Sequence, residues 1–421
     1  MYGGGVREGV VGEPRGMVAD VGARGWSPTV DLDADSVDER RLAWVYLSRV
    51  VAGPCAALSA LIESVGVVEA ARAVRESALP ESLRRPTEQR RGIDRAARDL
   101  ELMERMGGRV VTPDDAEWPA WRMLGLAQLD AARDPGGAVP LVLWVRGPCS
   151  LSASTERAVA LVGARCNSGY GRQVTAEVAG ELAEREWTIV SGAAYGIDGV
   201  AHRAALAVGG TTIAVLACGV DRPYPVEHER LLAEIAETGL VLSEYPPGTV
   251  ARKHQFLARN RLIAVLSDGV VVVEAGVRSG ARNTAKWARR LGRPALAIPG
   301  PVTSASSAGC HRMIRDGEAL LVTKAEEIID ETGPLRLALP DGPPVADRTD
   351  SLTGELAQVF DALPTIGSRQ PRELADRSGL PLPAVRAALS ALELAELVGT
   401  DENGWHRTAA TRRRAVSRES G

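Results

Sequence analysis

The sequence predicts an α/β protein built around a doubly wound, mostly parallel β-sheet. Between residues 107 and 332, short continuous apolar runs alternate with helical stretches of roughly 10 to 15 residues, a pattern typical of parallel strands covered by helices on both faces. The length of 421 residues leaves room for two or three domains. We therefore expect smaller domains beside the sheet domain.

The N-terminal part is predicted to hold a tail and a small helical domain. Residues 1–36 are rich in Gly and Asp and lack apolar periodicity, which is typical of a disordered tail. From residue 37 to 106, apolar residues recur at helical spacing, and Gly66 marks the end of one helix. We assign 37–106 to a helical domain of the sterile alpha motif or helix-hairpin-helix type.

The central domain, residues 107–332, contains the predicted sheet. GGRVV at 107–111 and the stretch 139–145 are expected to be its first strands. Six later strands, with a helix between each and the next, lie in the runs VALVG, WTIVSG, TIAVLACG, LVLSEY, GVVVVEA and PALAIPG.

The C-terminal part is predicted to be a linker, a winged helix and a tail. Residues 333–352 are crowded with Pro, Gly and Asp, as in a semi-rigid linker. Residues 353–410 contain three short helices and a wing, and 411–421 form a basic tail. The third helix offers only Arg386 as a basic side chain, beside Glu393 and Glu396, so we favour protein contact or weak DNA binding there.

The composition restricts the partners. With a net charge of −4, any nucleic-acid contact has to come from a local basic surface. The five cysteines are scattered without zinc-ligand spacing, and no stretch approaches the ~18 consecutive apolar residues of a membrane span. We expect a cytoplasmic protein with reduced cysteines that binds no metal, no cofactor and no membrane.

The first strand-to-helix junction, ALVGARCNSGYG, is a candidate anion site. Gly163, Arg165, Gly169 and Gly171 lie where a strand meets a helix N-terminus, whose amides and dipole favour anions. The spacing is not the G-x-G-x-x-G of a dinucleotide fold, and the second strand has no acidic residue at its end. The glycines alone favour a plain tight turn, whereas the guanidinium of Arg165 favours a phosphate contact.

The second junction, SGAAYGIDGVAH, again places small residues at the end of a strand. Glycines there permit a ligand to approach the backbone closely. Asp198 is a candidate N-cap, and we favour helix capping and packing for Asp198 and His202 over catalysis.

The third stretch, residues 243–288, combines basic and aromatic residues as single-strand-binding proteins do. Its basic residues flank two strand ends at the same edge of the sheet, so we expect them to converge with Arg165 in one groove. The members are Arg252, Lys253, His254, Arg259, Arg261, Arg278, Arg282 and Lys286, interleaved with Tyr245 and Phe256.

Motifs for catalysis are missing from the sequence. No lysine follows a glycine, so there is no phosphate loop, and neither H-E-x-x-H nor G-x-S-x-G occurs. We therefore expect a binding protein without catalytic residues rather than an enzyme.

Several long motifs in order resemble the DNA processing protein A (DprA/Smf) family. VGARCNSGYG is similar to the family's VGSR-x-x-T-x-YG, SGAAYGIDGVAH to its SG-x-A-x-GID-x-x-AH, and ACGVDRPYP to its GCG-x-D-x-x-YP. The segments SEYPPGT, F-x-x-RNR, VVVVEA-x-x-RSG and AIPGPVTSASSAGCHRMIRDG follow in the family's order.

The resemblance implies an extended Rossmann-like fold whose pocket binds single-stranded DNA. It also implies a homodimer through that domain and delivery of the strand to the RecA recombinase in natural transformation or homologous recombination. By motif position Arg165 is a phosphate ligand, and the pocket is lined by Gly163, Ser191, Gly192, Gly196, Phe256, Arg259, Asn260, Arg261, Ser279 and Gly280. We add Tyr195, Lys253 and Arg278 to the DNA-binding set.

Four departures from the family pattern bear on affinity and DNA path: Ala164 stands for Ser, Ser168 for Thr, Tyr195 for a frequent Lys or Arg, and Asn283 stands beside Thr284 in an altered RSGARNTA. Two alternative functions stay open. A Rossmann-type nucleotide N-glycoside hydrolase is disfavoured because its PGG-x-GT-x-x-E loop is missing and Lys286 stands about where the catalytic Glu would fall. A winged-helix transcription regulator is disfavoured by the acidic third helix.

Overall fold

The computed structural model describes residues 34–130, 136–333, 352–364, 367–395 and 397–408. The chain divides into two compact units, Met1–Pro334 and Leu335–Gly421, and each is described by itself. The predicted basic tail, nearly all of the predicted linker and most of the predicted N-terminal tail lie outside the described residues.

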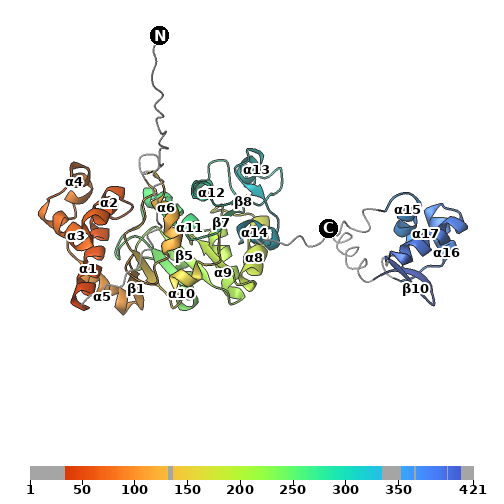
Figure 1. Ribbon diagram of the computed structural model, residues 1–421, viewed down its shortest axis with the longest axis horizontal. Helices are drawn as coiled ribbons and strands as arrows, with labels where there is room; N and C mark the ends of the chain where they lie inside the picture. The colour runs from red at the N-terminus through yellow and green to blue at the C-terminus, as the bar shows by residue number, and fades with distance from the viewer. Residues whose placement is uncertain (1–33, 131–135, 334–351, 365–366, 396, 409–421) are drawn as a thin grey trace, which may run out of the picture. The chain divides into compact units, whose positions relative to one another are not determined.

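The first unit is organised around one large sheet (Figure 1). Within the described residues it has nine strands in the order β1-β2-β6-β5-β4-β3-β7-β8-β9. The strands from β6 to β9 in this order are parallel, whereas β2 pairs antiparallel with β6 and with β1. The predicted doubly wound, mostly parallel sheet is confirmed. The strands are β1 Gly108–Val111, β2 Leu143–Arg146, β3 Ala158–Val162, β4 Thr188–Ser191, β5 Thr212–Leu216, β6 Leu240–Ser243, β7 Gly269–Val272, β8 Ala295–Ala297 and β9 Leu320–Leu321.

The central strands are buried on both faces, as their continuous apolar sequences require. Every residue of β3 and β7 is buried. Alternate residues of β3 belong to different cores: Ala160 packs with α6, α11, α12 and α13, whereas Val159 and Leu161 pack with α8, α9 and α14. The helices are α6 Ala120–Ala127, α7 Leu151–Ser154, α8 Gly169–Glu184, α9 Ile197–Ala207, α10 Glu229–Thr238, α11 Lys253–Val265, α12 Gly280–Arg290, α13 Ala308–Arg315 and α14 Ala325–Thr332, with a short 3-10 helix, η1, at Val226–His228.

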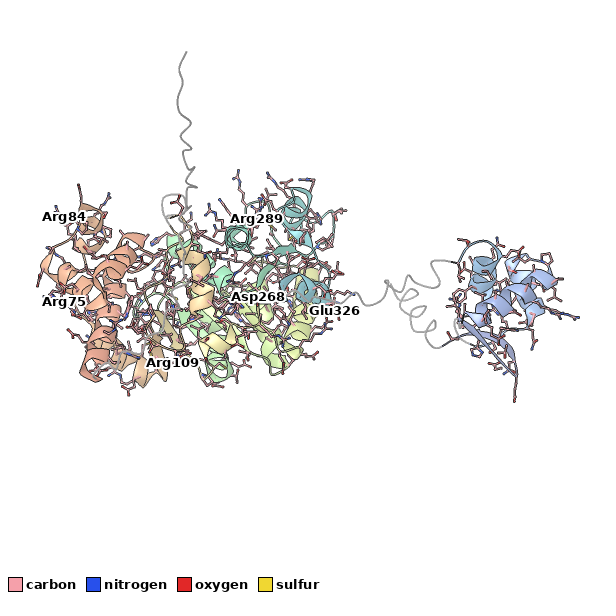
Figure 2. All side chains as sticks on the ribbon, viewed as in Figure 1. Arg75, Arg84, Arg109, Asp268, Arg289 and Glu326 are labelled. Carbon is pink, nitrogen blue, oxygen red and sulfur yellow. The ribbon has the colours of Figure 1, made fainter. Side chains whose placement is uncertain are left out.

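The predicted helical domain is present and packs directly on the sheet. Its helices are α1 Ala34–Val51, α2 Ala56–Val65, α3 Val67–Glu76, α4 Glu81–Glu88 and α5 Ala96–Arg105. Gly66 ends α2 as predicted, whereas α1 begins at Ala34, inside the predicted tail. Leu47 and Val50 share one core with Leu216 and Val241 of the sheet. Charged side chains such as Arg75 and Arg84 lie on the exposed surface of this domain (Figure 2).

The sheet contains a topological switch point between β3 and β7. From β3 the chain proceeds through β4, β5 and β6 in one direction, and then returns to form β7, β8 and β9 on the other side. The helices that follow β3 and β7 therefore diverge, and a crevice opens beyond the carboxyl ends of these two strands.

The second unit has the elements of the predicted winged helix. Three helices, α15 Glu355–Ala362, α16 Pro371–Ser378 and α17 Leu382–Leu394, pack around Phe360, Leu374 and Leu389. The hairpin of β10 Val398–Asp401 and β11 Gly404–Arg407 forms the wing. Arg386 and Glu393 of α17 are both exposed.

Candidate nucleic-acid interface

A cleft of about 800 Å³ lies at the switch point of the sheet. The turn after β3, the turn after β7 and the N-terminal half of α11 form its walls, so the Arg165 turn and the basic stretch 243–288 do meet. Of the eight basic residues predicted to converge there, Lys253, Arg259 and Arg278 line the cleft, whereas Arg252, His254, Arg261, Arg282 and Lys286 do not. The described lining residues that matter below are Gly163, Ala164, Arg165, Asp198, Tyr224, Ala251, Lys253, Phe256, Leu257, Arg259, Asn260, Arg278, Ser279 and Gly280.

Three cations border the cleft without an acidic partner. The side chains of Arg165, Lys253 and Arg278 are exposed, and none of them forms an ion pair with a residue in the described part of the chain. Arg165 instead lies over the ring of Phe256, 5.4 Å from its centroid. Their charge is therefore available to a bound anion.

Two aromatic rings lie beside these cations. Phe256 and Tyr224 are 5.2 Å apart at an interplanar angle of 51°, and Tyr224 is 44% exposed. Rings of this kind stack on unpaired bases. Tyr224 was missed among the predicted site residues although it lies in the ACGVDRPYP motif, whereas Tyr245, which was predicted to contribute, is only 1% exposed.

The helix N-terminus that faces the cleft is that of α12. Ser279 caps it by accepting a hydrogen bond from the Ala281 amide at 3.2 Å, and its first turn contains no acidic residue. Ser279 and Gly280 line the cleft, so the dipole and free amides of α12 favour an anion there. Asn260 fixes α11 against this turn by donating to the Gly280 carbonyl at 3.4 Å.

The first predicted anion site, at the N-terminus of α8, is occupied by a side chain of the protein itself. The carboxylate of Glu274, which follows β7, accepts from the Ser168 amide at 2.9 Å and from the Ser168 hydroxyl at 2.6 Å. A Cβ on Gly171 would lie 2.2 Å from the same carboxylate. The protein's own anion therefore fills the site that Gly169 and Gly171 were predicted to offer to a ligand.

Arg259 reaches the floor of the cleft but is only 5% exposed. Its guanidinium donates to the Gly192 carbonyl at 2.8 Å and to the Val215 carbonyl. Burial lowers the pKa of Arg259 and raises the pKa of the neighbouring Asp198, and the opposite charges of the two groups partly offset both effects. We had predicted that Asp198 is the N-cap of α9, and this prediction is wrong because the N-cap is Gly196. The Asp198 carboxylate instead accepts a hydrogen bond from the Gly192 amide at 3.2 Å.

Two predicted glycines shape the cleft from behind. A Cβ on Gly192 would lie 2.5 Å from the Arg259 guanidinium, so a larger residue would have to displace that guanidinium from its present position. Gly196 has φ +78°, and a Cβ there would lie 2.1 Å from the Ala164 carbonyl oxygen. Gly196 thus lets α9 begin against the turn that carries Arg165.

Other predicted residues lie outside the cleft. Ser191 is buried and donates to the Leu161 carbonyl at 2.6 Å, and the Tyr195 hydroxyl donates to Glu227. Arg261 has an exposed fraction of 0% and donates to both carboxylate oxygens of Glu244, at 2.8 and 2.6 Å. A guanidinium enclosed in this way is not accessible to a strand, so the structure gives no support to the predicted DNA contact of Arg261.

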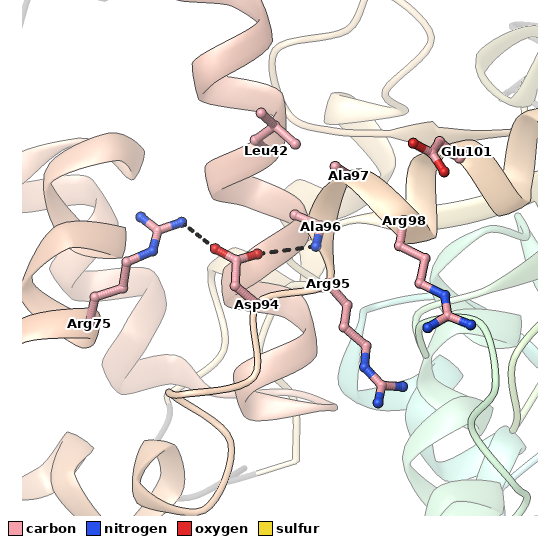
Figure 3. Close-up of a pocket in the computed structure, with 8 residues that line it drawn as sticks. All are labelled: Leu42, Arg75, Asp94, Arg95, Ala96, Ala97, Arg98 and Glu101. Atoms are coloured by element: carbon pink, nitrogen blue, oxygen red, sulfur yellow. Dashed lines mark hydrogen bonds and ion pairs between the residues drawn. The ribbon is translucent and has the colours of Figure 1, made fainter.

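A second cavity, of about 740 Å³, lies in the helical domain (Figure 3). It is bordered by Arg75, Asp94, Arg95 and Arg98 at the start of α5. Asp94 accepts from Arg75 at 3.0 Å and from the Ala96 amide at 3.1 Å. No sequence motif had indicated this cavity.

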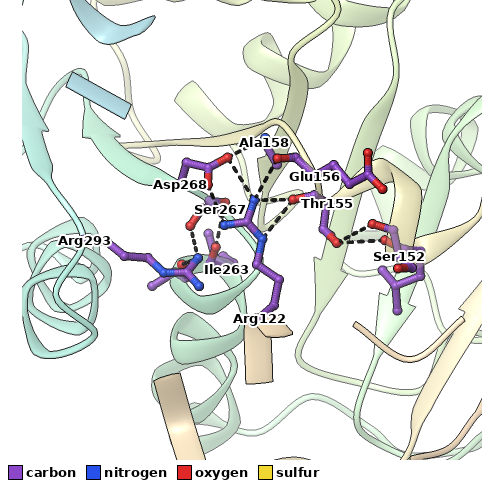
Figure 4. A network of polar contacts seen from close by, with 11 residues as sticks. Arg122, Ser152, Thr155, Glu156, Ala158, Ile263, Ser267, Asp268 and Arg293 are labelled. Atoms are coloured by element: carbon purple, nitrogen blue, oxygen red, sulfur yellow. Dashed lines mark hydrogen bonds and ion pairs between the residues drawn. The ribbon is translucent and has the colours of Figure 1, made fainter. Parts of the chain in front are cut away.

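A buried polar network holds the amino ends of β3 and β7 together, whereas the cleft lies at their carboxyl ends (Figure 4). Arg122 of α6 donates to both oxygens of Asp268, at 2.7 and 2.9 Å, and to the Thr155 carbonyl at 2.9 Å. Asp268 also accepts from the Ala158 amide at 3.1 Å. Burial, followed by the charge of Arg122, lowers the pKa of the neighbouring Arg293 to about 10. The two strands that carry the cleft are thus fixed relative to each other.

Comparison with known proteins decides the family. Residues 109–333 match the sequence model of the family described as DNA recombination-mediator protein A. The chain belongs to this family. A putative DNA processing protein DprA of Mycobacterium tuberculosis is 49% identical over 88% of this chain and 95% of its own length. Protein Smf of Escherichia coli is 39% identical over 66% of this chain and 74% of its own length.

The fold of the DNA recombination-mediator family is also found by structural comparison. The X-ray structure of DNA processing protein A from Streptococcus pneumoniae is similar with a TM-score of 0.55 and 31% identity. The match covers 72% of this chain and 99% of that one. The predicted resemblance to the DprA/Smf family is confirmed.

Among the described residues, no three His, Cys, Asp or Glu side chains come together in a way that suits a metal ion. Of the helices that the structure describes, none has both the length and the apolar character needed to span a bilayer.

Proposed function

We propose that this protein binds single-stranded DNA in the cleft and holds it for a recombinase, without making or breaking a bond. The observation that carries the proposal is the convergence, at one switch point, of three cations without an ion pair in the described residues, two neighbouring aromatic rings and the N-terminus of α12. Cations and helix amides bind phosphates, and the rings bind bases.

Single strands fit this arrangement better than duplexes. Stacking on Phe256 and Tyr224 requires bases that are not paired, and a cleft of about 800 Å³ accommodates a few nucleotides. Because the net charge of the chain is −4, the local cations have to supply the attraction.

The cleft also supports binding rather than hydrolysis. Asp198 is the one carboxyl group among its described lining residues, and that group is buried and hydrogen-bonded to the Gly192 amide. Activation of water needs an accessible base within reach of the substrate. Lys286, which lies exposed on α12, does not provide one.

Arg165→Ala tests the proposal. In titrations with a short oligothymidylate and with a duplex at two salt concentrations, we expect tighter binding of the single strand and a steep loss of affinity with salt. The substitution should weaken single-strand binding roughly 10-fold to 100-fold, the value of one charge-assisted phosphate contact. Arg157→Ala is the control, since Arg157 precedes β3 at the opposite edge of the sheet.

Three results would contradict the proposal. These are equal affinity for both forms of DNA, an unchanged affinity in the Arg165→Ala protein, and an equal loss in the Arg157→Ala protein. Release of a free base from a nucleotide would favour the hydrolase instead.

We further propose that the strand passes to the RecA recombinase and that the protein acts as a homodimer through its α/β domain. Membership of the recombination-mediator family supports the first part. The second is supported by the edge strand β9, whose Leu320 and Leu321 are half exposed and would be covered by a second copy. Measurement of RecA assembly on coated single strands, and of the oligomeric state of Leu320→Lys, tests both parts.

A further inference from the structure

A short segment of the helical domain concentrates positive charge. Between residues 84 and 98 the chain has six arginines, Arg84, Arg85, Arg90, Arg91, Arg95 and Arg98, but only two acidic residues, Glu88 and Asp94. The segment therefore carries a net charge of about +4 within a chain of −4. A local basic surface of this kind attracts polyanions.

Arg95 and Arg98 are the cations of this segment that line the second cavity. Both side chains are exposed, and in Figure 3 they extend in the same direction, away from Asp94. Asp94 pairs with Arg75, and Asp99, which Arg95 and Arg98 also attract, pairs with Arg49 at 2.5 Å. The third carboxylate at this cavity is the exposed Glu101. Within the described residues neither Arg95 nor Arg98 forms an ion pair.

The residues between the cleft and this surface are also basic. Ala251 lines the cleft and packs against the core that the helical domain shares with the sheet. The next residue, Arg252, lies close enough to Arg90 for their charges to repel. Arg90 is held in place by donating to the Val50 and Val51 carbonyls at 2.7 and 3.0 Å.

A phosphate backbone can connect these cations over a short distance. Arg90 and Arg95 are five residues apart, so no more than about 18 Å of extended chain separates them. The like charges of Arg90 and Arg252 repel each other in the free protein, and a polyanion lying across them relieves that repulsion. The cations thus continue from Lys253 through Arg252 and Arg90 toward Arg95 and Arg98.

We propose that a bound single strand of DNA does not end at the cleft but continues onto the helical domain, where Arg95 and Arg98 bind its phosphates. This inference rests on the proposed single-strand-binding function of the cleft. It gives the helical domain a direct role in binding and makes affinity depend on strand length.

The test is a length series with two matched double variants of the full chain. Arg95→Gln with Arg98→Gln removes two charges from the surface, and Arg157→Gln with Arg185→Gln removes two exposed charges at the opposite edge of the sheet. Oligothymidylates from roughly 5 to roughly 30 nucleotides span and exceed the lengths that single-strand-binding modules cover.

We expect the first double variant to bind the shortest strands like the wild type and the longest strands roughly 10-fold more weakly at low salt. On long strands its plot of log affinity against log salt should be less steep by about 1.4, or about 0.7 for each lost phosphate contact. The control variant should match the wild type at every length.

Several outcomes would overturn the inference. These are wild-type binding by the first variant at all lengths, an equal loss on the shortest strands, and an equal loss in the control. Binding of an acidic protein to the same surface, without dependence on strand length, would assign it to a protein partner. Failure of the cleft itself is distinguishable, because Arg165→Ala then leaves short-strand affinity unchanged.

Discussion

The ion pair between Arg261 and Glu244 gives the sharpest test of the structure. The two side chains are 0% and 3% exposed and share two hydrogen bonds between α11 and the end of β6. Arg261→Met leaves the Glu244 carboxylate buried without its partner, which costs roughly 3 to 5 kcal/mol of unfolding free energy. At roughly 2 to 4 °C per kcal/mol for a unit of this size, Tm should fall by about 6 to 20 °C.

The assay separates a structural role from a DNA-binding role. Thermal and urea unfolding followed by circular dichroism give the loss of stability. Single-strand affinity is then measured at a temperature at which the variant is folded, where we expect it to remain within about threefold of the wild type. The double variant Arg261→Met with Glu244→Leu should recover most of the lost stability, because no unpaired charge remains.

The opposite result would refute the buried ion pair. If Arg261→Met left Tm unchanged and abolished binding, Arg261 would be a DNA ligand, as its place in the RNR motif had suggested. A loss of stability that the double variant does not recover would mean that Arg261 acts through packing alone.

Three other predictions concern pH, the Arg165 turn and stacking. Burial, more than any neighbouring charge, lowers the pKa of His202 from 6.5 to about 3. The unfolded chain therefore binds the extra proton between these values, so stability is complete above pH ~6.5 and falls by ~1.4 kcal/mol per unit as pH decreases toward 3. Gly196→Ala should weaken single-strand binding as strongly as Arg165→Ala, measured by titration, because the new Cβ displaces the Ala164 carbonyl. Tyr224→Ala should cost roughly 1 to 3 kcal/mol of binding free energy in the same titration, the value of one stacked base.

Each of these predictions has its own control. His202→Asn should remove the pH dependence of urea unfolding between about pH 5 and about pH 7, and an unchanged slope would mean that another group titrates. Gly169→Ala should be neutral, since nothing lies within 4 Å of its Cβ position, and a large effect there would contradict the argument from close contacts. If Tyr224→Phe lost as much affinity as Tyr224→Ala, the hydroxyl rather than the ring would be the binding group.

The sheet and the position of the cleft could be predicted from the sequence for a simple reason. Parallel strands align their carboxyl ends, so residues that follow different strands meet at one edge whatever the strand order. Arg165 after β3 and Arg278 after β7 converge in this way.

Side-chain orientation and partners could not be predicted in the same way. In the RNR motif, Arg259 and Arg261 are two residues apart and therefore point about 200° apart around the axis of α11, one toward the floor of the cleft and the other toward Glu244. Glu274 closes the N-terminus of α8 although it follows a strand more than a hundred residues later in the chain. Contacts between such distant residues leave no periodic signal in one sequence.

The core shared by the helical domain and the sheet has a consequence for folding. Because Leu47 and Val50 pack in the same cluster as Leu216 and Val241, the helical domain has no separate apolar interior to retain when the sheet melts. We expect it to unfold together with the sheet in one cooperative transition, whereas the C-terminal unit, whose core is its own, unfolds in another. The arginines near α5 therefore belong to the same compact unit as the cleft. The distance between these arginines and the cleft is fixed by packing and not by a flexible linker.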